Sequence, residues 1–97
     1  KNQYTKWFDY DKIKGTLSLR HRQPGDYLTL PSGGRKTLKS WMIDEKIPRQ
    51  EREEIWLLAE EKHILWIVGH RISAYYKITE QTKTILEVEF NGGKSSG

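Results

Sequence analysis

The chain has 97 residues, of which 17 are lysine or arginine and 13 are aspartate or glutamate, so its formal net charge is +4. This length fits one domain with a single modest core and argues against a second. The absence of cysteine excludes disulfide scaffolds, thiolate zinc sites and cysteine nucleophiles, and the longest apolar runs are too short to cross a bilayer.

The N-terminal third is predicted to form two strands. The segment "YTKWFDY" (4–10) is rich in aromatic residues, as strands often are, and a short charged turn follows it. In "GTLSLRHR" (15–22) apolar and polar side chains alternate, which is the period of a strand with one buried face. Arg20 and Arg22 fall on the polar side of this pattern. We therefore expect two arginines on the solvent face of one strand.

The middle of the chain is predicted to change from turns to helix. Turn-forming prolines and glycines flank a short apolar piece at 27–30. From Arg35 onward the spacing of apolar residues becomes helical. The apolar stripe consists of Leu38, Trp41 and Met42, and a neighbouring stripe holds Lys36, Lys39 and Lys46. The sequence predicts a helix that buries the first stripe and exposes the lysines.

The second half of the chain is predicted to be mostly strands. Pro48 can open a short second helix, because a proline ring costs nothing at a first-turn position. The segments 55–59 and 63–69 read as strands joined by a charged turn, and 71–78 and 84–90 read as two more. With about six strands and two short helices, the predicted class is α+β, a small layered domain with a sandwich-like set of strands.

The stretch "LPSGGRKT" begins like a phosphate-binding loop. A Walker loop requires G-x-x-x-x-G-K-[ST], and Arg35 stands between Gly34 and Lys36, so the register fails. The adenylating loop S-G-G-x-D-S lacks its acid and second serine here. The histidines form no metal-ligand pair, and no nucleophile elbow is present. The sequence predicts no active site within this chain.

Four ordered motifs resemble the C-terminal domain of bacterial tRNA(Ile)-lysidine synthetase. They are "LRHRQPGD" (19–26), "GRKTLK" (34–39), "KIPRQER" (46–52) and "WIVGHRI" (66–72). The family pattern runs L-R-x-R-x-P-G-D, G-x-K-x-L-K, K-I-P-x-x-x-R and W-x-x-G-x-R in the same order. The similarity covers nearly the whole chain, and it extends to a module in the β subunit of bacterial phenylalanyl-tRNA synthetase.

The resemblance implies a division of labour within a larger enzyme. The parent would use ATP with magnesium to adenylate wobble cytidine 34 of tRNA(Ile) and join lysine there, acting as an ATP-dependent ligase in tRNA modification. Its catalytic S-G-G-x-D-S loop belongs to an N-terminal domain. The resemblance therefore implies that this fragment is non-catalytic, holds no cofactor or metal, and binds the acceptor stem of the tRNA.

Nine basic residues are the expected tRNA contacts. Four of them come first, because they lie on the predicted solvent faces of the strand and the helix, and a fifth lies in the turn that leads into that helix. The other four belong to the later motifs and rank second. They are Arg20, Arg22, Lys36, Lys39 and Arg35, then Lys46, Arg49, Arg52 and Arg71. Internal ion pairs with nearby acids are an equal alternative for Arg49, Arg52 and Arg71. Asp26 is expected to shape a turn and to orient an arginine or backbone amides.

The expected organisation is one tRNA-binding domain at 1–91 and a flexible tail at 92–97, cut from a longer cytoplasmic protein with no membrane contact. Its partners would be the tRNA(Ile) acceptor stem and the remaining domains of the parent. The alternative is a protein-interaction or dimerisation module without RNA contact. The aromatic-rich strands and the acidic segment "EREE" favour that alternative.

Overall fold

The computed structural model describes residues 4–91; the predicted tail at 92–97 lies outside this range. The described strands are β1 (Thr5–Asp9), β2 (Leu17–Arg20), β3 (Tyr27–Thr29), β4 (Arg35–Thr37), β5 (Leu57–Glu60), β6 (His63–Ile67), β7 (Arg71–Ile72) and β8 (Ile85–Glu89). The described helices are α1 (Leu38–Asp44), α2 (Arg49–Arg52) and two 3₁₀ turns, η1 (Tyr10–Lys12) and η2 (Ala74–Tyr76). The predicted α+β class with two short α-helices is confirmed.

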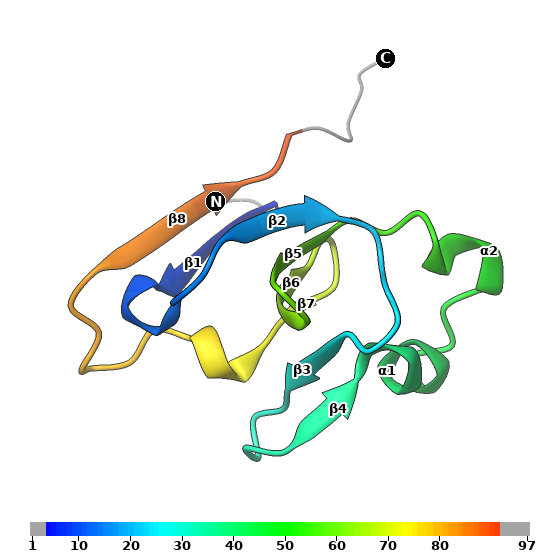
Figure 1. Cartoon of the computed structure of the whole chain (residues 1–97), viewed down its shortest axis with the longest axis horizontal. Helices are drawn as coiled ribbons and strands as arrows, with labels where there is room; N and C mark the ends of the chain where they lie inside the picture. The colour runs from blue at the N-terminus through cyan, green and yellow to red at the C-terminus, as the bar shows by residue number, and fades with distance from the viewer. Residues whose placement is uncertain (1–3, 92–97) are drawn as a thin grey trace.

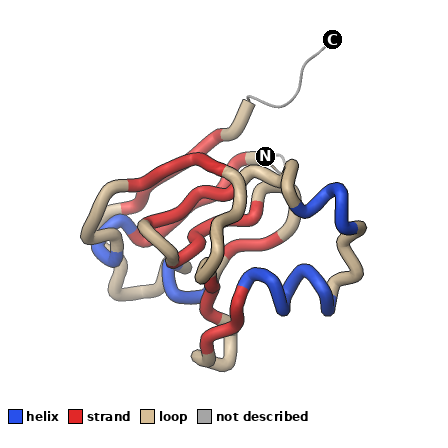
Figure 2. The backbone as a smooth tube through the Cα atoms, turned by 45° about the vertical axis from the view of Figure 1, so that its right-hand side comes forward, coloured by secondary structure: helices blue, strands red, loops and turns tan. Residues whose placement is uncertain are grey.

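The strands form two sheets (Figure 1). β1 and β8 make an antiparallel ribbon that joins the beginning of the described chain to its end. The larger sheet has the order β2-β5-β6-β3-β4, and the short β7 also pairs with β6. Only the β3–β6 pairing is parallel. α1 and α2 lie together at one end of the molecule, as the blue coils on the right of Figure 2 show.

The larger sheet is buried on both faces by two apolar clusters. One cluster joins α1 to the sheet and contains Leu28, Leu38, Trp41, Met42, Ile47, Leu57, Ala59, Ile64 and Ile67. The other joins the β1–β8 ribbon and η2 to the sheet and contains Phe8, Leu58, Leu65, Trp66, Val68 and Tyr76. Covering on both faces explains why β5 and β6 read as nearly continuous apolar runs without alternation.

A β-bulge in the centre of the sheet lets one strand serve both clusters. The register between β5 and β6 shifts between Leu58 and Ala59. As a result, the consecutive residues Leu65 and Trp66 both join the ribbon-side cluster. The backbone N–H of Ser73 donates to the carbonyl of Leu65 at 2.8 Å, so the displaced backbone remains hydrogen-bonded.

Helix α1 has defined signals at both ends. Its N-cap is Thr37, whose hydroxyl accepts from the backbone N–H of Ser40 at 3.1 Å. At its C-terminus, Lys46 has a left-handed φ of 57°. There the N–H of Ile47 donates to Met42 O, and that of Lys46 donates to Ile43 O, each at 3.0 Å, which is a Schellman motif.

Two predicted strands are shorter in the structure. The segment 15–22 is extended only over Leu17–Arg20. The segment 71–78 forms the two-residue strand β7 and then the 3₁₀ turn η2, so the prediction of a full strand there is wrong. The turn places Tyr76 in the core, 1 % exposed, with its hydroxyl donating to Glu60 Oε1 at 2.7 Å. This long-range bond to β5 cannot be read from a local pattern.

Candidate nucleic-acid interface

The glycine-rich stretch at 30–34 is a hairpin loop between β3 and β4. The N–H of Leu30 donates to Gly34 O, and that of Gly33 donates to Leu30 O, both at 2.8 Å. Gly33 has a φ of +100°, a conformation that favours glycine. The prediction that the helix begins at Arg35 is therefore wrong. Residues 35–37 complete the hairpin, and α1 begins at Leu38.

Arg20 is not on a solvent face but inside a clamp, which corrects the strand prediction. Both of its terminal nitrogens donate to the Asp26 carboxylate at 2.9 Å, and they also reach the carbonyls of His21 at 3.0 Å and Glu61 at 2.6 Å. The two side chains are 16 % and 1 % exposed. Asp26 accepts a further bond from Gln23 N at 2.8 Å. We call this set the Arg20–Asp26 clamp.

The clamp shapes the turn at 23–26, as predicted for Asp26. The N–H of Asp26 donates to Gln23 O at 3.2 Å, and Gly25 has a φ of +90°. The carbonyl of Asp26 accepts from Leu38 N at 2.8 Å, which fixes the start of α1 against the turn. Because a bidentate arginine–carboxylate pair is geometrically rigid, it holds this turn and the helix in one arrangement.

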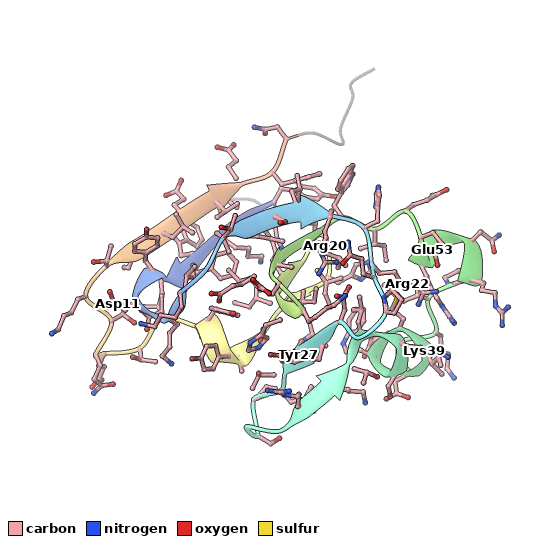
Figure 3. All side chains as sticks on the ribbon, viewed as in Figure 1. Asp11, Arg20, Arg22, Tyr27, Lys39 and Glu53 are labelled. Carbon is pink, nitrogen blue, oxygen red and sulfur yellow. The ribbon has the colours of Figure 1, made fainter. Side chains whose placement is uncertain are left out.

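Beside the clamp lies a basic groove between the turn, α1 and α2. It consists of two adjoining hollows of about 560 and 580 Å³ that share Arg22, Lys39 and Glu53. Arg49 and Arg52 line the hollow of about 580 Å³. Figure 3 shows Arg22, Lys39 and Glu53 gathered near α1 and α2, with Arg20 set back toward the sheet. We define the basic groove by Arg22, Lys39, Arg49, Arg52 and Glu53.

The cations of the basic groove differ in how firmly they are held. Arg22 pairs with Glu53 at 2.7 Å, and Arg52 donates from Nε to the carbonyl of Ile47 at 2.8 Å. Within residues 4–91, Lys39 and Arg49 form no ion pair, and both are exposed. The internal ion pairs weighed as an equal alternative for Arg49, Arg52 and Arg71 are not formed in this part of the chain. Of the four cations that define the basic groove, Arg22 is ion-paired, Arg52 is bonded to a backbone carbonyl, and Lys39 and Arg49 form no ion pair within the described residues.

The other predicted contacts lie outside the basic groove. Lys36 is on β4, not on a helix, and pairs with Asp44 of α1. Lys46 occupies the left-handed position that ends α1, and Arg71 is half-buried on β7. The guanidinium of Arg35 lies 4.0 Å from the centre of the Tyr27 ring. The structure thus brings together four of the nine predicted residues: Arg22, Lys39, Arg49 and Arg52.

A second hollow, of about 770 Å³, was not predicted. Stacked aromatic rings line it, and four basic side chains from three separate parts of the chain surround it: Lys12, Lys14, Arg35 and Lys62. Tyr27 stacks on His63 with ring centres 4.5 Å apart, and His63 lies 5.1 Å from Tyr75. One usable signal for this hollow is present in the sequence, the closely spaced lysines at positions 12 and 14. The rings carry no shared sequence pattern.

Glu60 anchors the floor of this second hollow. Burial acts to raise the pKa of its carboxyl group, but hydrogen bonds from the Tyr76 hydroxyl and from the N–H groups of Lys14 and Gly15 outweigh burial and lower it. Burial and the bond to Glu60 raise the pKa of Tyr76. Burial lowers the pKa of His63, and the charge of Arg35 adds to that effect. Both effects favour the neutral form of the imidazole.

Two further features bear on function. Within residues 4–91, no three histidine or acidic side chains are placed to hold a metal ion. The same part of the chain contains no helix of the length and apolarity needed to cross a membrane. The geometry that stands out is the basic groove together with the second, ring-lined hollow.

Comparison with known proteins identifies similar chains. The family described as "TilS substrate C-terminal domain" matches residues 17–89. The chain is 46 % identical over 91 residues to a tRNA(Ile)-lysidine synthase of Caldanaerobacter subterraneus subsp. tengcongensis, covering 93 % of this chain and 20 % of that protein. It is 41 % identical over 97 residues to the enzyme of Clostridium tetani, covering 99 % and 21 %. The chain spans about a fifth of the length of these curated relatives.

The fold also matches a solved structure, "Crystal structure of TILS C-terminal domain". The TM-score is 0.64 and the sequence identity is 30 %, and the match covers 88 % of this chain and 71 % of that one. Sequence and fold therefore agree on the same relatives.

Proposed function

This chain belongs to the family of TilS C-terminal domains, and from that premise we propose that it binds the acceptor stem of tRNA(Ile) within a tRNA(Ile)-lysidine synthase. The observation that carries the proposal is the basic groove, where Arg22 pairs with Glu53 and, within residues 4–91, Lys39 and Arg49 form no ion pair. Such a cluster of cations attracts a polyanion.

The chemistry of the basic groove favours the backbone of a duplex. Among the described residues, no aromatic side chain lines the basic groove, so no large ring is offered there for stacking on a base. An A-form stem presents phosphates and 2′-hydroxyls in its wide minor groove, and arginine and lysine can meet these without reading base edges. The basic groove would thus position the RNA by shape and charge.

Catalysis would lie in the parts of the enzyme outside this chain. Those parts would use ATP with magnesium to form lysidine at the wobble cytidine, in the cytoplasm, while this domain holds the far end of the tRNA. Calorimetric titration of the chain with ATP and magnesium tests this division, and the expected result is no binding. Saturable ATP binding would overturn it.

Binding of RNA hairpins provides the direct test. We propose fluorescence anisotropy with a labelled acceptor-stem hairpin and an anticodon-arm hairpin of equal length. The expected result is tighter binding of the acceptor stem, with log K falling by roughly 0.7–0.9 per phosphate contact against log salt. Equal affinity for the two hairpins would remove the acceptor-stem assignment, and affinity indifferent to salt would remove the phosphate contacts.

Matched variants separate the basic groove from the rest of the surface. The Lys39→Ala, Arg49→Ala double variant should weaken acceptor-stem binding, because both side chains are exposed and unpaired. Lys77→Ala and Lys83→Ala, which remove exposed lysines far along the chain, serve as the control with the same loss of charge. Equal loss in both pairs would show that net charge alone, and not the basic groove, governs binding.

The outer face of the β1–β8 ribbon favours a second candidate, a protein-interaction or dimerisation surface. Trp7 and Ile85 on the ribbon are 40 % and 54 % exposed, and Tyr10 of η1, which directly follows β1, is 50 % exposed. This surface could contact the remaining domains of the enzyme or a second copy. Sedimentation of the chain at high concentration tests self-association, and a strict monomer would exclude the homodimer.

A further inference from the structure

Beyond the basic groove, the second hollow contains a column of three rings with a cation at each end. The order is Arg35, Tyr27, His63, Tyr75 and Lys12. Arg35 lies 4.0 Å from the Tyr27 ring centre, and the Lys12 ammonium lies 4.7 Å from that of Tyr75. We call these five residues the aromatic column.

The outer parts of the aromatic column face solvent. Tyr75 is 41 % exposed, although tyrosine rings that serve only the core are buried as Tyr76 is, at 1 %. Arg35 and Lys62 are exposed at the rim. The hollow is therefore open at its sides, while hydrogen bonds between Glu60, Tyr76 and the backbone of Lys14 and Gly15 make its floor rigid.

We propose that the aromatic column is a subsite for an unpaired nucleotide of the bound RNA, which rests on the proposed function. Proteins that bind single strands combine cations that follow the backbone with rings on which bases stack. This hollow has both features, whereas the basic groove has cations without exposed rings. The basic groove would hold the duplex part of the RNA, and the aromatic column would hold its single-stranded extension.

The base would stack on Tyr75. The Lys12 side chain now covers the outer face of that ring and is held by one long hydrogen bond, 3.4 Å to the Tyr75 carbonyl. A base can take its place because lysine is flexible, and the displaced ammonium then lies next to the nucleotide's phosphate. His63 lies on the other side of Tyr75, at 5.1 Å between ring centres, and its lowered pKa favours the uncharged ring.

The path from the basic groove to the column is short. The Lys62 side chain lines the second hollow, and its Nζ donates to Gln23 Oε1 at 3.4 Å. Gln23 lines the basic groove. One side-chain contact therefore links the two surfaces across the turn that the Arg20–Asp26 clamp shapes. A strand leaving a duplex in the basic groove can continue past Lys62 to Tyr75.

Three RNA probes test the subsite: a blunt acceptor-stem hairpin, the same hairpin with a four-nucleotide 3′ overhang, and the overhang form with abasic sites. For the unmodified chain we expect the base-bearing overhang to bind at least about fivefold more tightly than the abasic one, since stacking of one base commonly has that effect. No difference between the two overhangs would overturn the inference.

Variants locate the stacking. Tyr75→Ala should abolish the preference for the base-bearing overhang and leave binding of the blunt hairpin unchanged, and Tyr75→Phe should retain the preference because it keeps the ring. A preference that persists in Tyr75→Ala would overturn the assignment. Tryptophan fluorescence shows whether Tyr75→Ala folds. If it does not, the double variant Lys12→Ala, Lys14→Ala provides the test: its affinity for the overhang hairpin must fall while its affinity for the blunt hairpin stays unchanged.

The outcomes distinguish this inference from the proposed function. Failure of the blunt hairpin to bind would contradict the basic groove. Loss of only the overhang preference would contradict the aromatic column. Binding of an acidic peptide in place of the overhang, abolished by Tyr75→Ala, would assign the hollow to a protein partner and also overturn the inference.

Discussion

The Arg20–Asp26 clamp and the basic groove lie side by side but use arginine in opposite ways. Arg20 directs its terminal nitrogens to a carboxylate that is 1 % exposed and to two backbone carbonyls. Arg22, two residues later, directs one side of its guanidinium to Glu53, which is 62 % exposed. The same residue type in one motif therefore serves the fold at Arg20 and lines the basic groove at Arg22.

This difference predicts which property each substitution should change, the free energy of unfolding or the RNA affinity. Removing one partner of a buried pair leaves the other charge unpaired and costs several kcal/mol, whereas an exposed pair contributes about 0–1 kcal/mol. Changes in the clamp should therefore alter the free energy of unfolding. Changes in the basic groove should alter RNA affinity and leave stability nearly unchanged.

The largest expected effect is that of Arg20→Ala. It leaves the buried Asp26 carboxylate without its cation, so we expect the free energy of unfolding to fall by about 3 kcal/mol or more. Urea titration followed by tryptophan fluorescence measures it. Arg22→Ala is the matched control, with an expected change of at most about 1 kcal/mol. Equal destabilisation by the two variants would erase the distinction between clamp and groove.

A second internal anchor, Glu60, gives a smaller effect. Tyr76→Phe removes the hydroxyl that donates to Glu60, at a cost of about 1–3 kcal/mol. Because folding lowers the Glu60 pKa, its contribution is present above the ordinary carboxyl pKa and is lost as pH falls through the folded-state pKa. Urea titrations over pH should therefore show a shallower acid dependence in Tyr76→Phe. An unchanged acid dependence would mean that this bond does not set the Glu60 pKa.

A substitution at Lys46 should change the stability of the fold without changing RNA affinity. Its φ of 57° is costly for a residue with a side chain, so Lys46→Gly should stabilise the fold by about 1 kcal/mol. We expect no loss of RNA affinity, because Lys46 does not line the basic groove. Thermal unfolding measures the change in stability, and hairpin binding measures the RNA affinity. A clear loss of affinity would return Lys46 to the contact surface.

The smallest expected effect is a gain in RNA affinity. Glu53→Gln removes the acid that pairs with Arg22, and it should raise RNA affinity by up to about fivefold, the equivalent of about 1 kcal/mol. Glu54→Gln, its exposed neighbour outside the groove lining, is the control. An affinity gain of the same size in both variants would indicate a general charge effect.

Local patterns predicted the parts of the fold that depend on local chemistry. The helical spacing of Leu38, Trp41 and Met42 correctly identified the buried stripe of α1. Its start was placed at Arg35 because the basic run also fits a helix, although Thr37 is a good N-cap residue. The hairpin hydrogen bonds that extend residues 35–37 join them to β3 and leave no local trace.

The candidate site was predictable in part for a related reason. Arg22, Lys39, Arg49 and Arg52 were expected as contacts, and they meet in one groove. Arg20 was misplaced because alternation in a strand says nothing of a partner at Asp26. The aromatic column was missed because its rings come from three distant positions, 27, 63 and 75, which only the parallel pairing of β3 with β6 and the turn η2 bring together.

The most direct test of the central claim is the salt dependence of acceptor-stem binding by the unmodified chain and by the Arg22→Ala, Lys39→Ala, Arg49→Ala variant. With three phosphate contacts removed at roughly 0.7–0.9 each, the slope of log K against log salt should become shallower by about 2 to 3. Arg20→Lys, which keeps the charge inside the clamp, should retain the original slope. An unchanged slope in the triple variant would contradict the assignment of the basic groove to RNA.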